Sequence, residues 1–181
     1  MNQKKEPTIK GIFVNSHINA VRREKGEAGV RELEKRYGSA IKFTNLEDVL
    51  VSDEISIIEL ALDIISNTSV PDGKRAFEAG RLHFQNFTTT PLAKIIFSTF
   101  TEPKKMFLNS KYIAEHVFNG ITFTSTDEGP NKVKVIMEGG HYPLDHFKGL
   151  FWEWINYFKL KPSIEAKQTS PERYEYLLQW K

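Results

Sequence analysis

The chain has 181 residues and contains no cysteine. This absence excludes disulfides, thiolate zinc sites, iron–sulfur clusters and cysteine nucleophiles in one step. We therefore expect a protein of a reducing compartment, with the cytoplasm as its location. A chain of this length can bury a substantial core without covalent cross-links.

Long apolar runs and a strong charge of one sign are also lacking. The longest apolar stretch, residues 55–65, is interrupted by Ser56, Glu59 and Asp63, so we expect no membrane span. The first residues are charged and are followed by no apolar segment, so we expect no export signal. The 25 basic and 23 acidic residues nearly cancel, and a nucleic-acid partner is not indicated.

Motifs of catalysis are missing as well. The sequence has no glycine-rich phosphate loop, no His-Glu-x-x-His and no Gly-x-Ser-x-Gly. The only polar residues that could together form a catalytic site are Glu102, His141 and Asp145. They include no nucleophile, and no metal or cofactor motif accompanies them. We therefore expect a protein that is not an enzyme.

The histidines also give no metal motif. Only His141 and His146 are close together in the sequence, and their spacing of five residues across a turn fits no common ligand pattern. We expect no bound metal. His83 and His116 stand beside apolar residues on expected helices, so they face either an internal pocket or the hydrogen-bonded edge of the core. The five histidines are His17, His83, His116, His141 and His146.

The N-terminal part of the sequence shows helical periodicity. A rhythm of 3.6 residues that begins at Ile12 predicts a helix that Gly26 stops. A second helix is expected over residues 27–37, with Gly38 as its C-terminal stop. Ser52 is placed to cap a third helix, which we expect to be central and almost wholly buried.

Prolines mark the next helices. Pro71 suits the start of a helix in which Gly80 permits a close helix contact. Pro91 can open the next helix, and Pro103 can open another that continues to about Phe118. These patterns predict a helical portion over residues 10–120.

From residue 121 the period changes to two. Residues 121–126 and 132–138 alternate around a turn and predict an antiparallel hairpin. An amphipathic helix follows, and residues 163–169 and 174–180 repeat the hairpin pattern. The sequence therefore predicts an α+β fold, in which residues 121–181 form a four-stranded antiparallel sheet of ββαββ order. We expect one domain over residues 10–181, preceded by a tail over residues 1–9.

The late helix carries a stripe of aromatic residues, Phe147, Phe151, Trp154 and Phe158. Such a stripe can resemble a cofactor box, but its helical spacing favours packing against the sheet.

Four local patterns, in the predicted order of elements, carry a resemblance to a known family. They are KGIFVNS at residues 10–16, GRL at 80–82, FKGLF at 147–151 and YLLQW at 176–180. Together they resemble the heme-nitric-oxide/oxygen-binding (H-NOX) superfamily, which is shared with four-vinyl-reductase domains and the TRAPP Golgi-transport subunits. Within it, the chain is most similar to a myxobacterial-type paralogous domain of unknown function. The resemblance extends from about Lys10 to Trp180.

Two departures from the heme-binding members of that superfamily concern heme itself. In those members a histidine on the helix after the fourth holds the iron, where residues 100–106 of this chain read FTEPKKM. A Tyr-x-Ser-x-Arg motif holds the heme propionates, where residues 137–141 read MEGGH. Without the axial ligand and the arginine, heme loses its coordinate bond and its charge-assisted hydrogen bonds. We therefore expect no heme and no other cofactor.

The resemblance implies a non-enzymatic, heme-free sensory or regulatory domain that binds a small apolar ligand or a signalling protein partner. The alternative is a TRAPP-like module for protein interaction or homodimerisation, with a filled core and no ligand. The side chains expected to line a pocket between the helices and the sheet are Phe84, Phe87, Phe107, Tyr112 and His116.

Overall fold

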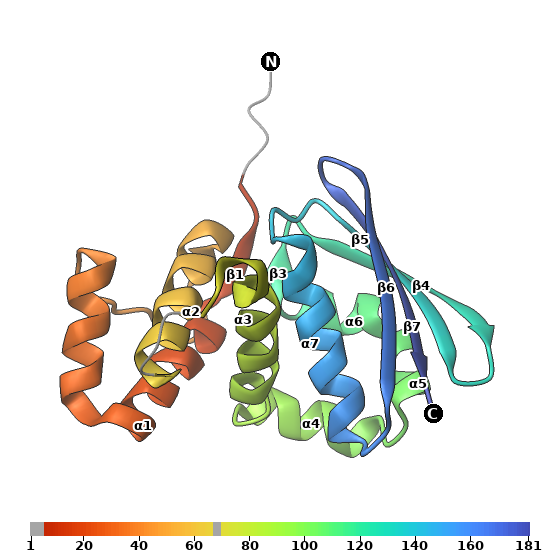
Figure 1. Ribbon diagram of the computed structural model, residues 1–181, viewed down its shortest axis with the longest axis horizontal. Coiled ribbons are helices and arrows are strands. Elements are labelled where there is room, and N and C mark those ends of the chain that lie inside the picture. Colours follow the sequence, from red (N-terminus) through yellow and green to blue (C-terminus); the bar gives the residue numbers. More distant parts are fainter. Residues whose placement is uncertain (1–5, 67–69) are drawn as a thin grey trace.

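The computed structural model describes residues 6–66 and 70–181. Figure 1 shows the helical portion beside a four-stranded sheet, with α3 and α7 lying between α1 and α2 on one side and the sheet on the other. The helices are α1 (Gly11–Tyr37), α2 (Val51–Ser66), α3 (Asp72–Phe87), α4 (Pro91–Thr99), α5 (Pro103–Leu108), α6 (Ser110–Glu115) and α7 (Leu144–Tyr157). The strands are β1 (Thr8–Lys10), β2 (Asp48–Leu50), β3 (Phe118–Asn119), β4 (Thr122–Gly129), β5 (Lys132–Glu138), β6 (Pro162–Ser170) and β7 (Arg173–Trp180).

The sheet portion confirms the predicted ββαββ order and the α+β class. The strand order is β4-β5-β7-β6, and every neighbouring pair is antiparallel. Val135 of β5 pairs with Tyr176 of β7, and both side chains are buried. The alternation of the sequence therefore places one apolar face of the sheet against α7, which lies across it (Figure 1).

Helix α1 combines the two helices that the sequence predicts over residues 12–37. Gly26 has φ 65° and ψ −167° inside it, a non-helical conformation that bends the chain at the predicted stop. Gly38 ends the helix in the left-handed conformation, and its N–H donates to the carbonyl of Glu34. Both glycine predictions are confirmed.

A small second sheet replaces part of the expected tail. The sequence predicts a tail over residues 1–9, but Thr8 and Ile9 belong to β1, which pairs antiparallel with β2 and β3. Ile9 has no exposed surface and pairs with Val49 and Phe118. Strands of two or three residues are too short to give an alternating pattern, so only long-range pairing reveals them.

Two helix predictions are wrong in extent. Helix α2 begins at Val51 rather than after Ser52, and it buries only the face that meets α1 and α3. Ile55 and Leu62 of this helix, which the sequence predicts to be almost wholly buried, are half-buried, because the opposite side of α2 has no covering layer among the described elements. The helix expected from Pro103 to Phe118 is interrupted at Asn109 and ends in β3.

Helices α3 and α7 approach each other through glycine, as the sequence predicts for Gly80. A Cβ at Gly80 would lie 1.8 Å from the carbonyl oxygen of His146, and one at Gly149 would lie 2.0 Å from that of Phe77. This contact brings side chains of α3 next to side chains of α7. None of the helices in the described ranges combines the length and the apolar character needed to cross a membrane.

Candidate functional site

An apolar cavity of about 70 Å³ lies between α3, α6, β4 and α7. Its wall is mainly aromatic and aliphatic, and its polar side chains are those of His83 and Ser110. The hydroxyl group of Ser110 is hydrogen-bonded to that of Ser125, with 2.6 Å between the two oxygens. The aromatic side chains of the wall are Phe13, Phe84, Phe87, Phe118, Phe123, Phe147, Phe151 and Trp154.

Two of the five predicted pocket residues, Phe84 and Phe87, line this cavity. Phe107 is fully buried but lies outside the wall, because its ring packs against Trp154 at 5.3 Å and Trp180 at 5.9 Å. Phe107 is therefore a core residue.

Tyr112 and His116 are not pocket residues. Tyr112 is 57% exposed and His116 is also exposed, and their rings lie 4.5 Å apart on the outer surface of α6. Their spacing does place them on a common face, as predicted, but α6 turns its other face, with Ile113 and Ala114, to the interior. Which face of so short a helix is buried depends on its packing against β4.

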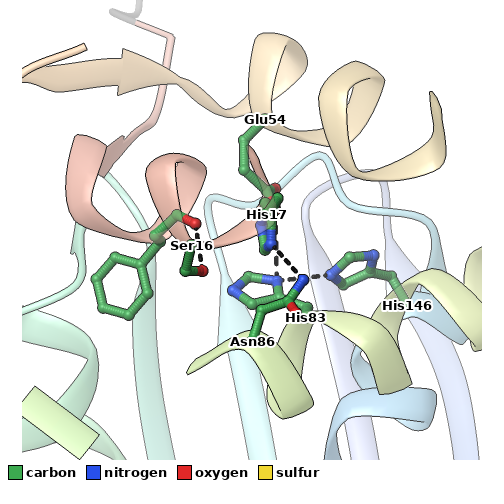
Figure 2. A network of polar contacts seen from close by, with 7 residues as sticks. Ser16, His17, Glu54, His83, Asn86 and His146 are labelled. Atoms are coloured by element: carbon green, nitrogen blue, oxygen red, sulfur yellow. Dashed lines mark hydrogen bonds and ion pairs between the residues drawn. The ribbon is translucent and has the colours of Figure 1, made fainter. Parts of the chain in front are cut away.

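A cluster of buried polar side chains adjoins the cavity. His17 comes from α1, Glu54 from α2, His83 and Asn86 from α3, and His146 from α7, and all five are buried. Figure 2 shows the three imidazole rings turned toward one another, with Glu54 above them and Asn86 below.

Hydrogen bonds connect this His–Glu cluster. His17 Nε2 lies 2.8 Å from Glu54 Oε1, and His83 Nδ1 lies 3.1 Å from His146 Nε2. His83 Nδ1 is also 3.5 Å from Glu54 Oε1. Asn86 Nδ2 donates to His17 Nδ1 at 3.0 Å, so His17 carries its proton on Nε2 and donates it to Glu54.

Two polar atoms beside these bonds make no hydrogen bond of ordinary geometry. They are Glu54 Oε2 and the Tyr142 hydroxyl, which are both buried and lie close enough to interact with each other. The Tyr142 ring lies 4.7 Å from the ring of His146. Burial and the nearby Glu54 carboxylate raise the pKa of Tyr142 well above its usual value, so this hydroxyl stays protonated.

The cluster shifts the pKa values of its members. Burial lowers the pKa of His83 to about 3 and that of His146 to about 4, despite the opposing effect of Glu54, so both imidazoles are neutral at pH 7. Burial acts to raise the pKa of Glu54, but His83, the hydrogen bond from His17 and His146 together lower it to about 2. The cluster therefore holds an ionised carboxylate among imidazoles.

His83 belongs to both features. Its side chain lines the apolar cavity, and its Nδ1 joins the His–Glu cluster. In Figure 2 one of its ring nitrogens points toward His146 and Glu54, and the other points away from them. A molecule in the cavity would thus lie beside a histidine that is connected to α1, α2 and α7.

The sequence did not predict this cluster. His17, His83 and His146 are far apart in the chain, and the only pair suggested by spacing was His141 with His146. His141 is exposed and lies 3.7 Å from Glu172. A usable signal was the position of each polar residue within an apolar helical stripe, which places Glu54 on the same face as Ile58 and Ala61.

The residues considered for catalysis are not brought together. Glu102 pairs with Lys105 at 2.8 Å, His141 faces Glu172, and Asp145 is exposed in the first turn of α7. Among the residues that the structure describes, no hydrogen bond or ion pair joins Glu102, His141 and Asp145.

Residues 3–181 match the model of a family described as "Protein of unknown function (DUF2378)". The chain belongs to the DUF2378 family. No curated protein matches this DUF2378 chain at a significant level.

Solved structures similar to the DUF2378 chain are H-NOX domains. One is an oxygen-binding H-NOX domain related to soluble guanylate cyclases, with 16% identity, 95% coverage of each chain and a TM-score of 0.71. A variant H-NOX from T. tengcongensis has 17% identity, coverage of 95% of this chain and 97% of that one, and a TM-score of 0.67. An iron(II) unliganded variant from K. algicida has 14% identity, coverage of 95% and 96%, and a TM-score of 0.66. The H-NOX-like α+β fold is thus confirmed. The assignment to a myxobacterial-type paralogue stays a prediction.

Proposed function

We propose that this DUF2378 chain is a heme-free, non-enzymatic sensory or regulatory domain that binds a small apolar ligand in the cavity beside His83. The observation that carries the proposal is the cavity itself: an aromatic enclosure with His83 and Ser110 as its polar contacts. Ligand sites are typically apolar pockets with a few placed polar groups. A similar structure described as an oxygen-binding H-NOX domain supports a sensory role.

The cavity volume limits the ligand. About 70 Å³ is roughly half of the ~150 Å³ cavity that accommodates benzene in an engineered protein. A ligand of a few heavy atoms therefore fits without movement of the wall. A larger ligand would have to displace aromatic side chains that pack against one another, such as Phe84 and Trp154, whose rings are 5.5 Å apart.

Heme does not fit this site. Pockets for drug-sized ligands and cofactors measure ~300–1,000 Å³, several times the volume present. The segment that would supply the axial histidine contains Met106 instead, which is buried and accepts the Trp154 indole N–H. The residues at this site thus support a cavity for a molecule smaller than a porphyrin.

A route for signalling follows from His83. A ligand that contacts its ring changes the hydrogen bonding of His83, which Nδ1 shares with His146 of α7 and, at 3.5 Å, with Glu54 of α2. A ligand can shift a conformational equilibrium only through different contacts in the two states. The His–Glu cluster supplies those different contacts in this proposal.

Xenon uptake followed by methyl NMR tests the cavity. We expect shifts confined to the methyl groups that line it, those of Ile113, Ala114, Val117 and Leu150. Ala114→Val adds methyl groups at the wall and should abolish the shifts, whereas Ala28→Val makes the same change on an exposed part of α1 and should leave them. Shifts that persist in Ala114→Val, or no saturable shifts in the wild type, would contradict a ligand-binding cavity.

The second candidate is a TRAPP-like interaction or dimerisation module. The small size of the cavity favours it, because most of the space between helices and sheet is filled by side chains. Sedimentation equilibrium distinguishes the two candidates. A stable dimer of a protein that takes up no xenon would favour the module, and a monomer that takes up xenon would favour the ligand-binding domain.

A further inference from the structure

We propose that His17, Glu54 and His83 form a buried binding site for a divalent transition-metal ion of the Zn²⁺ class. The site lies where α1, α2 and α3 meet, and it shares His83 with the wall of the apolar cavity. Nothing in the spacing of these residues along the sequence suggests such a site.

The distances between the donor atoms carry the proposal. One ligand atom each from His17, Glu54 and His83 lies within 4.8 Å of the other two. Donors at ~2.0–2.2 Å from a tetrahedral ion are about 3.4 Å apart. The distance of 3.5 Å between His83 Nδ1 and Glu54 Oε1 meets this value. The distance of 2.8 Å between His17 Nε2 and Glu54 Oε1 is shorter and would have to lengthen slightly on metal binding.

Among the described residues, the buried charge of Glu54 has no cationic partner of its own. Glu54 Oε2 and the Tyr142 hydroxyl are buried and make no hydrogen bond of ordinary geometry, although they lie close enough to interact with each other. In the described part of the chain, the ion-pair partners of Glu54 are His17 and His83, and no lysine or arginine is among them. A cation bound by Glu54 Oε1 together with His17 and His83 would balance the charge of this carboxylate.

The surrounding residues suit a metal centre. Asn86 contacts His17 Nδ1, and its amide can donate to that nitrogen or accept from it. When an ion takes the lone pair of His17 Nε2, the single ring proton moves from Nε2 to Nδ1, and Asn86 Oδ1 accepts a hydrogen bond from it after rotation of the amide. Such partners orient metal-bound histidines. His146 Nε2, 3.1 Å from His83 Nδ1, is the nearest further donor.

The donor set selects the class of ion. Imidazole nitrogens suit zinc, copper, iron and nickel, whereas Mg²⁺ and Ca²⁺ prefer sites made mostly of oxygen. Two histidines and a carboxylate therefore favour Zn²⁺ or a similar divalent ion. The ion would hold together three helices whose ligands stand at positions 17, 54 and 83 of the chain.

The test uses full-length protein prepared without a metal-affinity tag. Because the site is buried, the chain is unfolded in denaturant in the presence of a chelator. It is then refolded with Zn²⁺ or Co²⁺, and the metal content is measured after gel filtration. We expect about one equivalent per wild-type chain, a raised melting temperature and a visible Co²⁺ absorption of four-coordinate type. Co²⁺ absorption reads the ligands directly and needs no variant.

Variants and controls separate this site from surface binding. Glu54→Gln and His83→Gln should lose the bound metal, and Asn86→Leu should weaken binding by about 10- to 100-fold. His116→Gln and His141→Gln remove exposed histidines and should retain the full equivalent. Wild-type protein that refolds but binds no stoichiometric Zn²⁺ or Co²⁺ would overturn the proposal. Folded Glu54→Gln and His83→Gln proteins that still bind would overturn it as well.

Discussion

The backbone of Gly80 lies directly against the carbonyl oxygen of His146, with room for no side chain between them. A Cβ on residue 80 would be 1.8 Å from that oxygen and 2.9 Å from the nitrogen of Leu150. This contact seats α3 on α7 and brings His83 within hydrogen-bond distance of His146. The packing of two helix backbones therefore positions both the cavity wall and the His–Glu cluster.

Gly80→Ala should destabilise the protein by about 1–3 kcal/mol, because the added methyl group forces α3 and α7 apart. Gly73→Ala is the matched control on the same helix, since a Cβ there meets nothing within 4 Å. That control should be neutral or stabilising by up to about 1 kcal/mol. Urea unfolding of both variants measures the difference. Equal stability of the two would show that the helices separate freely.

Trp154→Ala should destabilise the protein by about 3–5 kcal/mol, since Trp154 is 6% exposed and packs between Phe84 and Phe107. Trp152→Ala, two residues away on α7, removes a half-buried indole that contacts Phe77 and should cost less. Denaturant midpoints of the two variants give the comparison. A midpoint of Trp154→Ala equal to that of the wild type would contradict the packing.

Phe107 and Tyr112, which the sequence places in one pocket, should respond differently to truncation, because one is buried and the other exposed. Phe107→Ala removes a fully buried ring and should cost about 3–5 kcal/mol. Tyr112→Ala removes an exposed ring and should change stability by no more than about 0.5 kcal/mol. Thermal unfolding measures both. A large loss on changing Tyr112 would mean that α6 buries this face, for example against a second chain.

Purified protein mixed with hemin should show no stoichiometric Soret absorption after gel filtration. The reasons are the small cavity and the absence of a histidine at residues 100–106. His83 is the one histidine among the cavity-lining residues, so His83→Ala is the informative variant. An H-NOX domain that binds heme serves as the positive control. A stoichiometric Soret band in the wild type that is lost in His83→Ala would contradict the heme-free proposal.

Much of the fold could be predicted from local sequence alone. The alternation over residues 132–138 and 174–180 predicted the sheet and its buried face, because side chains of a strand point to opposite sides in turn. Gly26, Gly38 and Pro91 marked where helices bend, end and begin, because their backbone conformations are restricted or permitted locally. These features depend on residues close together in the chain.

Other features depended on tertiary contacts. Ile9 became part of a strand only by pairing with Val49 and Phe118, which lie far away in the sequence. Tyr112 and His116 share a helix face, as their spacing predicted, but the packing of α6 against β4 turned that face outward.

The sequence by itself determined the α+β class, the order of the late strands and helix, and the lack of thiol chemistry, because composition and periodicity are local properties. Only the tertiary structure decided the size of the cavity and the meeting of His17, Glu54, His83 and His146. These polar residues lie among apolar residues on the buried faces of four different helices. Their common position follows from the angles and distances at which α1, α2, α3 and α7 pack, and side chains far apart in the sequence jointly set that packing.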